Sequence, residues 1–185
     1  LDENKPAIIL TAHFSNWELL GNFVGLNAIN HNHKLHVLYT HMHDKDIDNY
    51  VLNTRERGGM FMINKDISVM KLIHMLKGGA HIALLNDVSG TGKMIVPFLG
   101  KNATNMPGVA VMSILSGAPI IPVCSYRLAP FEHEVEFFEP LTMPDSNLNH
   151  DERLRLIVLE CNKALEKFIR KRPDLWFWLH NRWRD

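Results

Sequence analysis

Short apolar runs rich in β-branched residues alternate along this chain with longer segments that carry apolar residues at helical spacing. The first kind predicts strands at Ala7–Thr11, Leu35–Tyr39, Met60–Ile63, His81–Leu85, Met94–Phe98, Ile120–Tyr126 and Glu134–Phe138. The second predicts helices at about 16–26, 44–57, 68–76, 107–115 and 151–170. This alternation predicts an α/β fold with a mostly parallel central sheet and helices on both faces.

The composition is that of a globular domain. The chain has 185 residues, of which 46% are hydrophobic and 22% charged, so one domain can bury a substantial core. Because no internal repeat, low-complexity stretch or linker interrupts it, we expect residues 1–185 to form a single catalytic domain. The formal net charge of +0 argues against nucleic-acid binding by general electrostatics.

The cysteines and the lengths of the apolar runs indicate the cellular environment of the chain. Cys124 and Cys161 fall in a strand-like and a helix-like run, so we expect reduced core thiols in a cytosolic environment. The longest apolar runs, such as 117–123, are far short of the roughly 18–20 residues that span a bilayer. The chain begins at Leu1 without an initiator Met, so we expect a longer protein in which an upstream segment could anchor it to a membrane.

The most informative chemical feature is an H-x-x-x-x-E element, His13 to Glu18, directly after the first predicted strand. An imidazole titrates near neutral pH and can take and return a proton, and a carboxylate on its far ring nitrogen would fix its tautomer. No G-x-S-x-G elbow supplies a nucleophilic serine. A His–Glu dyad without its own nucleophile favours an enzyme that activates a hydroxyl of its substrate, as in acyl transfer.

The same residues also have a structural interpretation. Ser15 and Glu18 fit a capping box, with Ser15 as the N-cap and Glu18 reaching back to a free backbone N–H. The two interpretations are compatible, because a capped helix start would hold both side chains beside the carboxyl edge of the sheet. That edge is where sites form in open α/β sheets.

Two arginines and an aspartate are further candidates. Arg55 and Arg57 end the second predicted helix, where they could contact a phosphate or merely complement the helix dipole. Asp87 follows the fourth predicted strand, and on its own it is typical of a residue that caps a loop.

A histidine-rich segment suggests a metal, but its spacing does not. His31, His33, His36, His41 and His43 span a loop, a strand and another loop, without a nearby cysteine or a helical H-x-x-x-H pair. Zinc needs three or four convergent ligands, so we expect no metal site and treat most of these histidines as surface residues.

The C-terminal segment 167–184 interleaves basic and aromatic side chains. Tryptophan and cations favour the headgroup zone of a membrane, and each basic residue near an anionic surface contributes about 1 kcal/mol. The aromatic side chains could equally cover the core while the charges stay in solvent. We expect some of the tryptophans to be buried and others to be available to a bilayer.

Taken together, these pieces closely resemble the lipid A biosynthesis acyltransferases, the late lauroyl/myristoyl-type enzymes of the wider lysophospholipid-acyltransferase-like group. The resemblance covers essentially the whole chain. It rests on the H-x-x-x-x-E element, V-P-F-x-G-x-x-A-T at 96–104, S-G-A-P at 116–119 and W-F-W-x-H-x-R-W at 176–183. It implies a glycerolipid-acyltransferase-like fold.

The resemblance implies transfer of a fatty acyl group from acyl-acyl carrier protein, or acyl-CoA, to a hydroxyl of a lipid A precursor. The reaction would occur on an anionic membrane surface, at the cytoplasmic face of a bacterial inner membrane. His13 would be the general base and Glu18 its partner. Substrate-binding positions would be Arg55, Arg57, Asp87 and Thr104, and the chemistry requires no cofactor or metal.

One loop departs from the family pattern. Family members read close to D-Q-D-x-G, but with Gly90 aligned the two acidic positions hold Asn86 and Val88 here. Only Asp87, between them, is acidic. This leaves two alternatives open: a glycerolipid or mannolipid acyltransferase of the same fold, or a membrane-surface domain that has lost activity.

Overall fold

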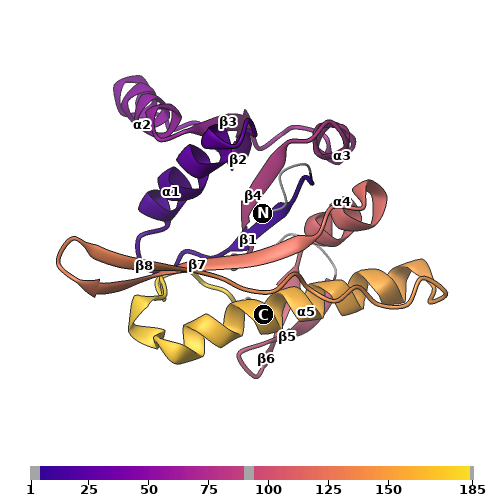
Figure 1. The fold of residues 1–185 in the computed structure, drawn as a ribbon. Helices are drawn as coiled ribbons and strands as arrows, with labels where there is room; N and C mark the ends of the chain where they lie inside the picture. Colours follow the sequence, from indigo (N-terminus) through magenta and orange to yellow (C-terminus); the bar gives the residue numbers. More distant parts are fainter. Residues whose placement is uncertain (1–4, 90–93, 184–185) are drawn as a thin grey trace.

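The computed structural model describes residues 5–89 and 94–183, and it confirms an α/β fold built on a mostly parallel sheet (Figure 1). Gly90 of the departing loop and Arg184 of the basic tail lie outside the described residues. The strands of the main sheet are β1 (Ile8–Thr11), β2 (Leu35–Tyr39), β3 (Met60–Asn64), β4 (His81–Leu85), β7 (Ile120–Ala129) and β8 (Glu132–Phe137). Their spatial order is β3-β2-β4-β1-β7-β8.

The first five strands in that spatial order run parallel, and β8 pairs antiparallel with β7 at the edge. Strand β1 lies in the middle and pairs with both β4 and β7. Its four residues are all buried, as expected for a strand covered on both faces. The chain therefore leaves β1 at the centre of the sheet's carboxyl edge.

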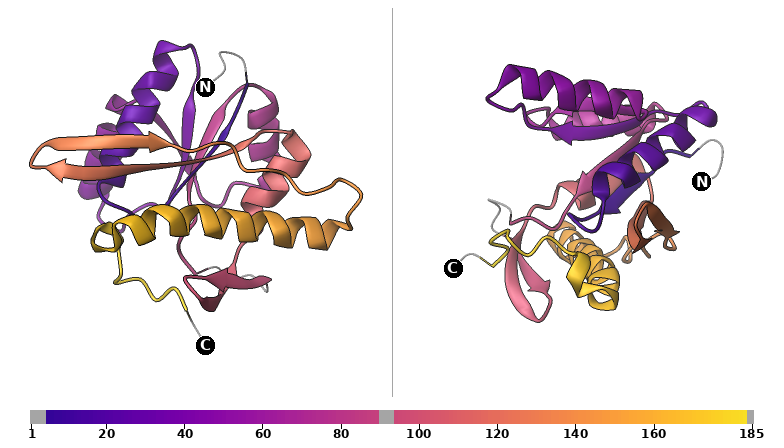
Figure 2. Two further views of the ribbon diagram at one scale, coloured as in Figure 1. Left: turned by 60° about the horizontal axis from the view of Figure 1, so that its bottom comes forward. Right: turned by 90° about the vertical axis from the view of Figure 1, so that its left-hand side faces the viewer.

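The helices are α1 (Trp17–Asn30), α2 (Lys45–Arg57), α3 (Val69–Lys77), α4 (Gly108–Ser116) and α5 (His150–Lys171), followed by a 3-10 turn, η1 (Pro173–Leu175). On one face of the sheet, α1 packs Leu20, Val24 and Ala28 against Ile9 and Val123. On the other face, α3, α4 and α5 close the larger core, and Figure 2 shows α5 running across the strands.

Local stop and start signals explain most of the helix boundaries. Asp44 and Ser68 accept hydrogen bonds from the first turns of α2 and α3, and α4 ends at Gly117 with φ +77°. The predicted capping box at α1 is wrong. The N-cap is Asn16, whose side chain accepts from Leu19 N–H, while Ser15 has φ +52° and stands outside the helix.

A second, small sheet was only half anticipated. Strand β5 (Met94–Phe98) pairs antiparallel with β6 (Lys101–Asn105) through a turn at Leu99-Gly100, both with positive φ. Strand β6 was not predicted because its residues, Lys-Asn-Ala-Thr-Asn, are mostly polar and only Ala103 and Asn105 are buried. Cys124 and Cys161 are unpaired and buried in the main core.

Candidate active site

His13 lies where the chain leaves β1, and the register of the sheet determines what stands beside it. Strands β1 and β4 are parallel, and their partners run from Ile8↔Ile82 to Thr11↔Leu85. Two residues beyond the last pair on each strand are His13 and Asp87. The sheet thus delivers an imidazole and a carboxylate to the same point of its carboxyl edge.

The two side chains are joined there. His13 Nδ1 lies 2.9 Å from Asp87 Oδ1, and the backbone N–H of His13 donates to Asp87 Oδ2 over 3.0 Å. The indole Nε1–H of Trp176 donates to the same Oδ2 over 2.8 Å. Asp87 is 3% exposed and His13 27% exposed, so the carboxylate is enclosed while the ring reaches solvent.

The electrostatics of this pair define a tautomer. Burial alone would raise the pKa of Asp87, but the hydrogen bond and charge of His13 and the Trp176 indole outweigh it, and the net pKa lies below its ordinary value. An ionised Asp87 can only accept, so His13 Nδ1 carries the proton that it shares with the carboxylate. His13 Nε2 then keeps its lone pair, which is what a general base needs.

The C-terminal tail holds this loop in place. Ser15 N–H donates to Leu175 O over 2.7 Å, and Phe177 N–H donates to His13 O over 2.9 Å. Between them, Phe14 and Trp176 form an antiparallel bridge. Trp176 is thus fixed at its backbone as well as at its indole. Trp176 was not among the predicted site residues, although the W-F-W-x-H-x-R-W segment that contains it carried the family resemblance.

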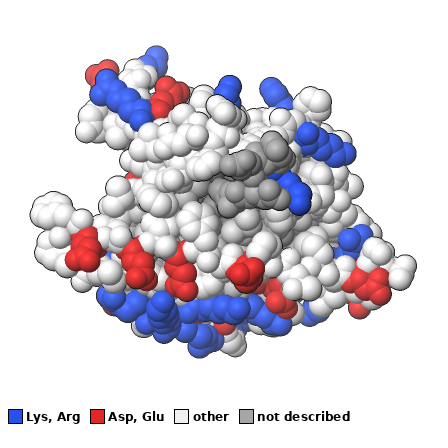
Figure 3. Space-filling view, viewed as in Figure 1, with Lys and Arg blue, Asp and Glu red and all other residues white. Residues whose placement is uncertain are grey.

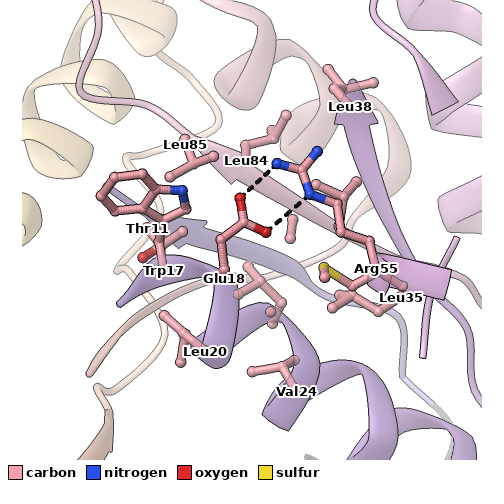
Figure 4. Close-up of a pocket in the computed structure, with 15 residues that line it drawn as sticks. Thr11, Trp17, Glu18, Leu20, Val24, Leu35, Leu38, Arg55, Leu84 and Leu85 are labelled. Carbon is pink, nitrogen blue, oxygen red and sulfur yellow. Dashed lines mark hydrogen bonds and ion pairs between the residues drawn. The ribbon is translucent and has the colours of Figure 1, made fainter. Parts of the chain in front are cut away.

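Glu18 is not where the sequence analysis placed it. We expected Glu18 to hold the imidazole, but that carboxylate is Asp87, and Glu18 forms a bidentate pair with Arg55 (Figure 4). The Arg55 Nε–H and Nη2–H donate to Glu18 over 2.9 and 2.6 Å. The reason is positional: Glu18 lies in the first turn of α1 and projects toward α2, whereas Asp87 follows the strand beside His13.

The remaining candidate residues are divided between the surface and a neighbouring network. Arg57 ends α2 and is exposed; being two residues from Arg55 in a helix, it points elsewhere. Thr104 lies on β6, with its hydroxyl 3.0 Å from that of Ser89, which is two residues beyond Asp87 in the chain. Its carbonyl accepts from Arg182, which is fully buried and not, as we expected for the basic residues of segment 167–184, in solvent or at a membrane surface.

An apolar cavity lies under the ion pair of Glu18 and Arg55 (Figure 4). It opens between α1 and the sheet, and its lining is mainly aliphatic, including Ile9, Leu20, Val24, Leu35, Leu38 and Met60. Trp17 forms part of the wall and packs edge-on against the His13 ring, with ring centroids 5.2 Å apart. The cavity is therefore one aromatic ring away from the histidine.

A wider cleft of about 690 Å³ lies on the other side of Trp17. It is bounded by the start of α1, the β7–β8 hairpin and the end of η1, and it carries polar groups such as Asn16, Arg127 and His133. Trp17 and Glu18 line both spaces. A narrow apolar cavity and a broad polar cleft thus adjoin at the residues next to His13.

Across residues 5–89 and 94–183, no three His, Cys, Asp or Glu side chains are grouped so as to hold a metal ion. In the same part of the chain, no helix combines the length and apolar character needed to cross a bilayer.

Fold and site together define an α/β domain that presents a carboxylate-held histidine at the carboxyl edge of its sheet, beside an apolar cavity. The chain belongs to the bacterial lipid A biosynthesis acyltransferase family, whose model matches residues 1–185, and this confirms the resemblance inferred from the sequence.

Two curated relatives match most of the chain. One is the lipid A biosynthesis palmitoleoyltransferase of Escherichia coli (strain K12), and the other is a lipid A biosynthesis acyltransferase of Shigella flexneri. Each is 24% identical over 185 residues, covering 98% of this chain. The chain spans only 57% of the length of either relative.

Proposed function

We propose that this protein is an O-acyltransferase that moves a fatty acyl chain from a thioester of acyl carrier protein to a hydroxyl of a lipid A precursor. The observation that carries the proposal is the His13–Asp87 pair, set next to an apolar cavity at the carboxyl edge of the sheet. Membership of the lipid A biosynthesis acyltransferase family supports both the reaction and the type of acceptor.

The reaction needs one base and no nucleophile from the protein. His13 Nε2 takes the proton of the acceptor hydroxyl as its oxygen attacks the thioester carbonyl. The tetrahedral intermediate then collapses, the C–S bond breaks, and the proton on Nε2 passes to the departing thiolate. An ester and a free thiol are the products. Asp87 keeps the ring in the reactive tautomer and stabilises the imidazolium that forms in between.

Glu18 and Arg55 contribute to substrate binding in this proposal, and Glu18 is not the partner of His13. Their pair spans α1 and α2 at the cavity, with Arg55 19% and Glu18 47% exposed at their side chains. The pair uses Nε and Nη2 of the guanidinium, so Nη1 can donate to a phosphate or to the thioester carbonyl. We therefore assign Arg55 to substrate binding and Glu18 to holding it.

The two spaces beside Trp17 suit the two substrates. A fatty acyl chain gains about 0.8 kcal/mol for each methylene group that it buries, which favours the aliphatic cavity, of about 80 Å³, for the first methylene groups of the donor chain. The larger cleft, with its polar groups, suits the sugar headgroup of the acceptor. In this arrangement the carbonyl and the hydroxyl meet at His13.

The surface supports a membrane-bound acceptor at the cytoplasmic face of the inner membrane. Figure 3 shows Lys and Arg side chains gathered in a band along the lower edge of the molecule, over α5. Exposed basic residues of α5 include Arg155, Lys163 and Lys167. Beyond the helix, Trp178 is 53% and Leu179 88% exposed. Cations beside apolar side chains suit an anionic bilayer.

The test is an acyl-transfer assay with the full-length protein and radiolabelled acyl-acyl carrier protein, with acyl-CoA as a second donor. Transfer to a lipid A precursor would support the proposal. Transfer only to a glycerolipid or a mannolipid would reject the acceptor but keep the chemistry. No transfer to any of these acceptors would reject the enzyme and favour a membrane-surface protein without activity.

A further inference from the structure

Arg55 is held from two sides, and only one of them is the ion pair with Glu18. On the other side, its guanidinium carbon lies 5.0 Å from the centroid of the Tyr39 ring. Tyr39 is the last residue of β2 and is 6% exposed, so its ring is part of the rigid sheet edge. A guanidinium over an aromatic face is attracted by the ring quadrupole and restricted in its orientation.

The Tyr39 ring is itself locked by a buried carboxylate. Its hydroxyl donates to Asp48 Oδ1 over 2.5 Å. Asp48 also accepts the backbone N–H of Met42 over 2.8 Å, and its other oxygen lies 2.7 Å from His41 Nδ1. The hydrogen bonds from Met42, Tyr39 and His41 lower the pKa of Asp48 to about 2, so it is ionised at neutral pH.

These contacts matter because α2 has little else to fix it. Asp48 is the one residue of this helix that is buried, and apolar side chains such as Ile47 and Tyr50 are 54% and 72% exposed. Figure 1 shows α2 projecting from the body of the molecule at one end of the sheet. A helix without an apolar face in the core needs polar anchors to hold a side chain in a defined place.

We propose that Tyr39 and Asp48 are positioning residues that fix Arg55, and through it Glu18, at the mouth of the apolar cavity. The proposal rests on the substrate-binding role of Arg55 described above. Asp48 anchors the start of α2 and orients the phenol, and the phenol face sets the plane of the guanidinium near the end of the helix. Neither residue needs to touch substrate.

The experiment is a double-mutant cycle on transfer activity between Tyr39→Leu and Arg55→Ala in the full-length protein. Tyr39→Leu should lower kcat/KM by about threefold to tenfold, the effect of losing a partly buried cation–π contact. In the Arg55→Ala background, the same substitution should have no further effect, because there is no guanidinium left to position. Tyr39→Phe keeps the aromatic ring, so its kcat/KM should fall less than that of Tyr39→Leu.

Tyr50→Leu is the matched control, since Tyr50 is exposed on α2 and away from Arg55; it should leave kcat/KM unchanged. Thermal unfolding of each variant separates positioning from loss of fold. Equal losses from Tyr39→Leu with and without Arg55 would overturn the proposal, as would an unchanged kcat/KM in Tyr39→Leu. Failure of the proposed function has a different signature: absence of transfer by the wild type, or full transfer by Arg55→Ala.

Discussion

Two histidines stand at opposite ends of the same pair of strands, and their surroundings give them opposite chemistry. His13 follows β1 at the carboxyl edge, is 27% exposed and shares the proton on Nδ1 with Asp87. His81 begins β4 at the amino edge, is 1% exposed and accepts the backbone N–H of Ala7 at Nδ1 over 3.0 Å. Its proton is therefore on Nε2.

The surroundings of the two rings account for the difference. Burial and the nearby His33 lower the pKa of His81 to about 4, so it stays neutral and serves as a hydrogen-bond acceptor within the core. His13 has a buried carboxylate instead of a backbone amide at Nδ1, which leaves the lone pair on Nε2 of a ring that is 27% exposed. The identity of the group at Nδ1 separates a structural histidine from a candidate catalytic one.

The largest expected effect comes from removing the candidate base. His13→Ala should lower the rate of acyl transfer by a factor on the order of 10²–10⁴, the usual contribution of a positioned general base. The far-UV circular dichroism spectrum should not change. His81→Asn is the control: it removes an imidazole from the same two strands, and the folded protein should keep its transfer rate. Equal losses in the two variants would contradict the distinction.

The next effect tests which carboxylate serves His13. In Asp87→Asn, the amide can donate to Nδ1 and leave the proton on Nε2, so that His13 adopts the tautomer of His81. The transfer rate should fall by a factor about tenfold to a hundredfold smaller than in His13→Ala, because Asp87 affects the reaction only by positioning and charging His13. The pH–rate profile should also change in Asp87→Asn.

Glu18→Gln provides the comparison for that variant. Gln can still accept a hydrogen bond from Arg55, so we expect mainly a raised KM and an unchanged pH–rate profile. A profile altered by Glu18→Gln but not by Asp87→Asn would restore the dyad first expected from the sequence.

The error over Glu18 shows where sequence reasoning reached its limit. Periodicity and turn residues were sufficient for the α/β class and for most strands, because those signals are local. Asp87 is 74 residues from His13, and the two meet only because β4, the next strand but two along the chain, lies beside β1. Strand order depends on which helices cover which face, and no short motif reports it.

The contacts of the tail are similarly non-local. Trp176 reaches Asp87 across 89 residues, and Arg182 reaches Thr104 across 78. The sequence showed that this segment was aromatic and basic, and Trp176 and Trp178 do divide between core and surface as expected, 4% and 53% exposed. The hydrogen-bond acceptor of each indole could be identified only from the packed structure.

Trp176 offers a smaller and more selective change. Trp176→Phe keeps an aromatic ring in the core but removes the donor to Asp87. A hydrogen bond to a charged group contributes about 1.5–3 kcal/mol, and if part of this reaches the transition state the rate falls by up to about tenfold. Losing a donor also raises the pKa of Asp87, and a more basic carboxylate stabilises the protonated form of His13, so the acid limb of the pH–rate profile should move to higher pH. Trp178→Phe, whose indole donates to Pro173 O, should leave that limb in place.

The smallest effect on transfer is expected from changes at His81. The pKa of this residue is tested instead through the pH dependence of the free energy of unfolding. The pKa of His81 is about 4 when folded, against an ordinary 6.5, so between these values the unfolded chain binds the proton and the native state does not. The stability that a neutral His81 contributes is complete above pH 6.5 and is lost as the pH falls toward 4, roughly 3 kcal/mol across the window. His81→Asn keeps an acceptor for Ala7 N–H without a titrating group, so chemical denaturation should show a shallower fall in its free energy of unfolding over this range. Parallel curves for wild type and variant would mean that His81 is protonated in the native state, and the contrast with His13 would then fail.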